Sequence, residues 1–202
     1  SNGITYTSTG NGGVLLSAYP TFPEFSDTYY ENLLASVNSY NNYSFDFDGI
    51  DDFVYIPNSD EINTGSAPHK KKTIEAWFKA DSVNSSSHRQ TIYEQGGTVR
   101  GLNIYIYEGL LYVGGWNEPD GESDWDPGTW LSTTGTGDEI IESGKWHHVA
   151  LTLDASDANN VQSNVLKGYL DGKEFGSGSG SKLWSHGGDV SIARNRDTKF
   201  SP

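Results

Sequence analysis

The stretch WHHVALTLD, residues 146–154, decides the fold. Its apolar residues from Val149 to Leu153 recur at every second position, which is the period of a β-strand with one buried face. A second run at 165–170 ends in Asp171-Gly172, a pair that favours the positive backbone angles of a tight hairpin turn. The sequence therefore predicts antiparallel strands in this region.

Other parts of the chain carry the same signals. Alternating or short apolar runs predict further strands at 53–56, 73–79, 90–94, 102–107, 110–113, 173–175 and 189–193. The alternation of Phe45 and Phe47 with aspartates is also typical of a strand. Residues 27–40 alone have helical spacing, and residues 114–137 resemble a loop. We therefore expect an all-β protein with one short helix near the N-terminus.

Length and composition favour one folded domain. A chain of 202 residues fits a single β-sandwich, and we place this domain at residues 41–202, with residues 1–40 as an extension packed on it. The 12 Tyr, 8 Phe and 6 Trp predict a core rich in rings. Without Met or a signal peptide, the sequence indicates an excised domain with a cloning remnant at Ser1-Asn2.

The charge of the chain restricts its partners. A formal net charge of −14 argues against nucleic acid, whose phosphates repel an acidic surface, and it disfavours an anionic membrane surface. No apolar run is long enough for a membrane span. With no Cys, the fold has neither disulfides nor thiol metal sites. The excess of carboxylates is compatible with calcium, which takes oxygen ligands.

Four aspartates, Asp46, Asp48, Asp51 and Asp52, lie within seven residues around a predicted turn. Carboxylates at this density can bind calcium together with backbone carbonyls, and we predict Asp48, Asp51 and Asp52 as the metal ligands. The alternative is a turn in which the Asp side chains accept hydrogen bonds from nearby backbone N–H groups. The sequence is compatible with both.

The segment WNEPDGESDWDPGTW, residues 116–130, combines three Trp with five acidic residues. Indole rings stack on the apolar faces of sugars, and carboxylates or amides accept hydrogen bonds from sugar hydroxyls. We predict stacking by Trp116, Trp125 and Trp130 and hydroxyl recognition by Asn117, Glu118 and Asp120. The alternative is a long surface loop held in place by its own tryptophans.

Catalytic signals are weak. His147 and His148 are adjacent on a predicted strand, so their side chains point to opposite faces and cannot converge on one ion. The paired carboxylates that glycoside hydrolysis requires are not found on a predicted strand, because Asp120–Asp126 lie in a loop-like segment with Pro and Gly. Nucleophile elbows and phosphate loops are missing as well. We expect no enzymatic activity.

Five short motifs together resemble one family. They are FDFDGIDDFV (45–54), TIEAW (73–77), WHHVA (146–150), YLDGK (169–173) and SIARN (191–195), in this order. This order is similar to that of the concanavalin A-like laminin G domains of large bacterial surface and secreted proteins. The resemblance implies a jelly roll of two antiparallel sheets, and a calcium ion held near the turn of the first motif.

The resemblance has one departure. Such domains usually close with a final strand after the SIARN-like motif, and this sequence reaches Pro202 without it. Either the parent protein was cut before this strand, or residues 1–40 take its place. An unpaired sheet edge favours aggregation. We therefore expect Thr5–Leu16 to pair at a sheet edge.

The functional expectation is a non-catalytic, lectin-like module of an extracellular or cell-surface protein that binds a carbohydrate on the concave sheet or through residues 116–130, with calcium as its cofactor. The alternative is a structural or protein-adhesion domain without a glycan site. The fold does not decide between them, because function depends on the site.

Overall fold

A computed structural model of the chain describes residues 44–118, 125–195 and 199–200. These residues fall into two compact units, one containing residues 44–52 and the other beginning at Phe53. The predicted helix at 27–40, the predicted domain boundary near residue 40 and the predicted pairing of Thr5–Leu16 lie outside the described residues.

The described part of the larger unit contains ten strands and two short helical turns. The strands are β1 (Val54–Ile56), β2 (Lys71–Phe78), β3 (Gln90–Gly96), β4 (Arg100–Tyr107), β5 (Leu110–Asn117), β6 (Trp125–Ser132), β7 (His147–Asp154), β8 (Gln162–Leu170), β9 (Lys173–Gly180) and β10 (Val190–Ile192). The turns are η1 (Asp60–Thr64) and η2 (Gly137–Glu139).

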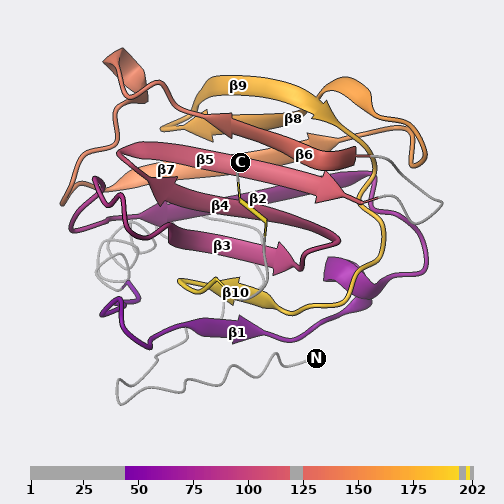
Figure 1. Cartoon of the computed structure of the whole chain (residues 1–202), viewed down its shortest axis with the longest axis horizontal. Helices are drawn as coiled ribbons and strands as arrows, with labels where there is room; N and C mark the ends of the chain where they lie inside the picture. Colours follow the sequence, from indigo (N-terminus) through magenta and orange to yellow (C-terminus); the bar gives the residue numbers. More distant parts are fainter. Residues whose placement is uncertain (1–43, 119–124, 196–198, 201–202) are drawn as a thin grey trace, which may run out of the picture. The chain divides into compact units, whose positions relative to one another are not determined.

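Two antiparallel sheets are stacked face to face (Figure 1). One has six strands in the order β1-β10-β3-β4-β5-β6, and the other has four in the order β2-β7-β8-β9. This arrangement is the predicted all-β jelly-roll sandwich. No helix among the described residues is long and apolar enough to cross a membrane.

The core lies between the inner faces of the sheets. Leu102, Ile104 and Ile106 of β4 and the alternating residues Val149–Leu153 of β7 are almost completely buried there. The predicted strand period at 146–154 is therefore confirmed. Asp171 and Gly172 have φ angles of 50° and 81°, as the predicted tight hairpin turn between β8 and β9 requires.

Three predictions are wrong. Residues 44–48 form no strand, although Phe45 and Phe47 do contact each other, with ring centroids 6.0 Å apart. Residues 114–137 are not one loop, because they contain the end of β5 and all of β6. Pro127 is tolerated in β6 because that strand lies at the sheet edge. The core is mainly aliphatic, and several rings lie on the outer face of the six-stranded sheet instead.

Candidate functional site

Trp116 and Trp125 are both buried. Trp116, at the end of β5, is 0% exposed, and its indole N–H donates to the Gly97 carbonyl over 3.0 Å. Trp125, at the start of β6, is 2% exposed, belongs to the core and donates to Thr129 Oγ1 over 3.0 Å. A ring with no exposed face cannot stack on a sugar, so the predicted stacking role is wrong for both residues.

Trp130 occupies an intermediate position on β6. Its half-buried ring lies nearly parallel to that of Trp116, with 6.0 Å between centroids and 15° between planes. It also lies directly over Gly114, because a Cβ atom added there would be 2.3 Å from its indole nitrogen. That nitrogen has no hydrogen-bond partner among the described residues. The predicted stacking role of Trp130 stays a prediction.

The three predicted polar residues are in different situations. Asn117 is fully buried and donates to Ser181 Oγ and to the Lys182 carbonyl over 2.9 and 3.0 Å, so it does not reach an external sugar and that prediction is wrong. Glu118 is half-buried and forms an ion pair with Lys199. Asp120 lies outside the described residues.

The exposed tryptophans are in the other sheet. Trp77 on β2 is 68% exposed, and Trp146, directly before β7, is 49% exposed. Trp77 is paired across the strands with His148, and strand alternation places Trp146 and His148 on the same side of β7. Both indoles therefore lie on the outer face of the four-stranded sheet. The sequence contained a signal for Trp77, since it alternates with core-facing Ile74, Ala76 and Phe78.

Polar groups surround these two rings. The ring centroid of His148 is 5.1 Å from that of Trp77, and its Nε2 is 3.6 Å from Glu75 Oε2. The Lys79 ammonium is 5.8 Å from the centre of the Trp146 ring. The outer face thus presents two flat apolar surfaces beside hydrogen-bond donors and acceptors.

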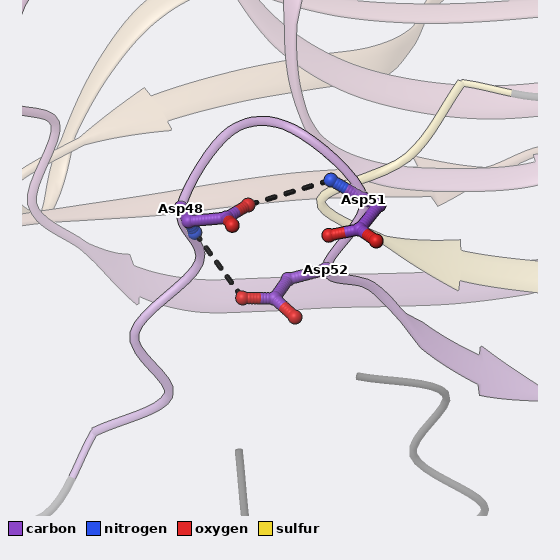
Figure 2. A group of neighbouring side chains, drawn as sticks. All are labelled: Asp48, Asp51 and Asp52. Atoms are coloured by element: carbon purple, nitrogen blue, oxygen red, sulfur yellow. Dashed lines mark hydrogen bonds between the residues drawn. The ribbon is translucent and has the colours of Figure 1, made fainter. Parts of the chain in front are cut away.

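The carboxylates of Asp48, Asp51 and Asp52 come together as predicted. One oxygen from each lies within 4.8 Å of the other two (Figure 2). The alternative turn bonds are present as well: Asp48 Oδ1 accepts from the Ile50 N–H over 2.8 Å, and Asp52 Oδ2 accepts from the Asp48 N–H over 3.3 Å. Oxygen ligands suit calcium, and the Asp51 carboxylate accepts no hydrogen bond from a described residue.

His147 has a structural environment. Its Nε2 accepts from the Glu142 N–H over 2.9 Å, which leaves the proton on Nδ1 to donate to Asp171 Oδ2 over 2.8 Å. Asp171 Oδ1 also accepts from the His148 N–H over 2.7 Å. The two histidines lie on opposite faces, His147 against Phe78 and His148 against Trp77, as predicted.

A shallow depression of about 470 Å³ lies between residues 96–100 and residues 185–188. His186 lines it, and burial, the largest influence, lowers the pKa of its imidazole to about 4. The ring is therefore neutral at physiological pH, with Nδ1 2.8 Å from the Trp184 carbonyl oxygen and Nε2 3.2 Å from Gln95 Nε2. These contacts hold the loop at the wall of the depression.

Comparison with known proteins agrees with the two-sheet architecture. A family model described as the concanavalin A-like lectin/glucanases superfamily, of laminin G type, matches residues 47–201. The chain belongs to this family. No curated protein matches this laminin G-like chain.

Solved structures similar to this laminin G-like domain have low sequence identity to it. The receptor-binding domain of botulinum neurotoxin D has 15% identity and a TM-score of 0.51, over 72% of this chain and 34% of that one. Domain 4 of an extracellular arabinanase from Geobacillus stearothermophilus, in complex with arabinotriose, has 15% identity and a TM-score of 0.46, over 72% and 59%. Domains LG4-5 of mouse laminin α1 have 15% identity and a TM-score of 0.43, over 67% and 32%. The laminin G-like chain thus spans less than two thirds of each of these chains.

Proposed function

We propose that this laminin G-like domain is a non-catalytic carbohydrate-binding module of a secreted or cell-surface protein. One observation carries the proposal: Trp77 and Trp146 expose their rings on the same outer face of the four-stranded sheet. Large rings are usually covered, and neighbouring exposed rings mark an interaction site. The family also supports carbohydrate as the ligand class, since its description includes lectins and glucanases.

The chemistry of this face suits a sugar. The indoles offer flat surfaces to the C–H groups of a pyranose. His148 lies beside Trp77, with Glu75 next to it, and both side chains can form hydrogen bonds with sugar hydroxyls. Lys79 next to Trp146 adds a donor for hydroxyl or carboxylate oxygens. The outer face therefore replaces the 116–130 segment as our main candidate for the glycan site.

The non-catalytic assignment rests on the chain's own residues. The Glu-x-Asp-x-Glu spacing occurs at residues 118–122, where the intervening Pro119 and Gly121 disfavour a strand with two carboxylates on one face. His147 has both ring nitrogens committed to Glu142 and Asp171. A buried imidazole held in this way orients a turn rather than exchanging protons with a ligand.

The rival proposal is a protein-adhesion or structural domain without a glycan site. Exposed Trp residues also dominate the energetics of protein interfaces, so the same face fits a protein partner. The experiment must therefore distinguish a carbohydrate ligand from a protein partner.

A glycan array probed with wild type, Trp77→Ala, Trp146→Ala and the control Val161→Ala tests the proposal. Val161 is an exposed apolar residue directly before β8, at the opposite end of that strand from Asp171, which contacts His148. We expect wild type and the control to bind the same sugars, and each Trp variant to lose about tenfold in affinity, or ~1.4 kcal/mol. Binding to no glycan by the folded wild type would favour the adhesion domain.

We also propose that Asp48, Asp51 and Asp52 bind calcium. Calcium at about a hundred times its dissociation constant would stabilise the folded state by roughly 2.7 kcal/mol, and a chelator would reverse this. Asp51→Asn is the sharpest variant, because the turn bonds use the carboxylates of Asp48 and Asp52. The expected result is a calcium-dependent melting temperature in wild type that the variant loses. A melting temperature unaffected by calcium and chelator would remove this proposal.

A further inference from the structure

The outer face of the six-stranded sheet carries a second group of aromatic and amide side chains. Asn103 and Tyr105 of β4 alternate with the core residues Leu102, Ile104 and Ile106, so they point away from the core. Tyr105 stacks on Tyr112 of β5, with 4.8 Å between centroids. Yet Asn103 is 0% exposed and Tyr105 only 1%. These side chains are therefore covered.

The segment Lys199–Phe200 contributes to this cover. Asn103 Nδ2 donates to the Lys199 carbonyl over 2.6 Å. The Phe200 ring meets Tyr105 edge-on, with 4.9 Å between centroids and 82° between planes, and the Arg89 guanidinium lies 4.8 Å from the same ring. The phenylalanine side chain thus fits between a tyrosine and an arginine.

The lysine side chain is recognised separately. Its ammonium forms ion pairs with Glu118, directly after β5, and with Asp126 of β6 at 3.2 Å. Partial burial alone would lower the pKa of Lys199, but hydrogen bonds and charge from the two carboxylates outweigh it and raise that pKa. The two acids therefore favour a charged ammonium between them.

We propose that this face is a recognition site for a lysine–aromatic peptide segment, and that Lys199–Phe200 occupies it as an intramolecular ligand. Three parts of the segment are contacted separately. Asn103 donates a hydrogen bond to the Lys199 carbonyl, and Glu118 and Asp126 form ion pairs with the Lys199 ammonium. Tyr105 and Arg89 contact the Phe200 ring. This site is separate from the Trp77 face and independent of the glycan proposal. A tethered occupant acts at an effective concentration on the order of millimolar, so it excludes weaker external ligands.

The test uses the full chain with Lys199→Ala and Phe200→Ala together, which leaves the length unchanged. A blocked peptide of sequence TKFS is titrated into this variant and into wild type, with the peptide TAAS as the control. We expect saturable binding of TKFS to the variant, at least about tenfold weaker binding to wild type, and none of TAAS. When Glu118→Gln and Asp126→Asn are added to this variant, its affinity for TKFS should fall about tenfold relative to the variant without them. Equal binding of both peptides, no binding to the folded variant, or glycan binding that only the variant shows would overturn the proposal.

A second measurement uses wild type alone, in case the variant does not fold. Amine acetylation followed by mass spectrometry compares Lys199 with exposed Lys70. Slower modification of Lys199 is expected, because its ammonium is held by two carboxylates. A Lys199 that reacts as fast as Lys70 would contradict a bound segment.

Discussion

The two sheets treat their outer aromatic residues in opposite ways. On the four-stranded sheet, Trp77 and Trp146 remain open to solvent. On the six-stranded sheet, Tyr105 and Trp116 are covered, and Phe200 from far along the chain contributes to the cover of Tyr105. On each face at least one ring alternates with core residues along a strand: Trp77 on β2 and Tyr105 on β4. The difference shows that alternation places a ring on the outer side, whereas exposure depends on what the rest of the chain lays over it.

Replacing a buried and an exposed tryptophan gives the largest expected difference in the free energy of unfolding. Trp125→Ala removes a core ring, and we expect it to lower the free energy of unfolding by ~3–5 kcal/mol. Trp77→Ala removes an exposed ring and should change that free energy by no more than ~0.5 kcal/mol. Urea denaturation measures both. Similar losses for the two variants would mean that the Trp77 face is covered in solution, which would also undermine it as a binding surface.

The close packing of the six-stranded sheet can be tested at a glycine. A Cβ atom at Gly114 would lie 2.3 Å from the Trp130 indole nitrogen and 2.5 Å from Asn103 Oδ1. Gly114→Ala must therefore displace the Trp130 ring, and we expect a loss of ~1–3 kcal/mol in the free energy of unfolding together with a changed near-ultraviolet circular dichroism spectrum.

Gly187→Ala is the matched control for this substitution. Nothing lies within 4 Å of a Cβ atom placed at Gly187, and its φ angle is not in the left-handed region, so a loss within ~0.5 kcal/mol is expected. If Gly114→Ala were equally mild, the stacking of Trp130 on the sheet would be looser than described.

Local patterns predicted the framework well. The period at 146–154 and the Asp171-Gly172 turn gave β7 and the β8–β9 hairpin, because both depend on nearest neighbours in sequence. The same holds for the aspartate turn, where Asp48 bonds backbone groups two and three residues away. Such features are encoded within a few residues.

The end of β5 and all of β6 were missed because their residues are typical of loops. A Cβ atom at Gly115 would be 2.5 Å from the Trp125 ring, so this position of the strand is a glycine because the ring fills the space that a side chain would need. Pro127 is permitted by the sheet edge. Neither reason is visible without the partner strand and the ring that fills the space.

The candidate site was predicted only in part. The prediction that Asp48, Asp51 and Asp52 lie together is correct. For the sugar site, however, the tryptophan-rich segment 116–130 was chosen instead of Trp77, which alternates with core residues on β2. The burial of Trp116 and Asn117 depends on residues distant in sequence, such as Lys182. The cover of Asn103 by Lys199 comes from 96 residues away, beyond any local pattern.

The smallest expected effect concerns the turn that leads away from the Trp77 face. Asp171 accepts hydrogen bonds from the His147 ring and the His148 N–H. Partial burial alone would raise the pKa of Asp171, but these bonds and the neighbouring histidines outweigh it and lower that pKa. Asp171→Asn, which tolerates the φ of 50°, replaces one acceptor by a donor. We expect a loss of ~1 kcal/mol at neutral pH, kept small because the carboxylate is 46% exposed.

The pH dependence of this effect follows from the lowered pKa. Because the folded-state pKa lies below the unfolded value of about 3.9, the carboxylate stabilises the fold above that value, and this stability is lost as pH falls through the folded-state pKa. The gap between wild type and Asp171→Asn in the free energy of unfolding should therefore be present at pH 7 and shrink toward pH 2. Asp81→Asn, at an exposed position with no hydrogen bond to a described residue, serves as control. A gap that stayed constant with pH would show that the contribution of Asp171 to this turn does not depend on the charge of its carboxylate.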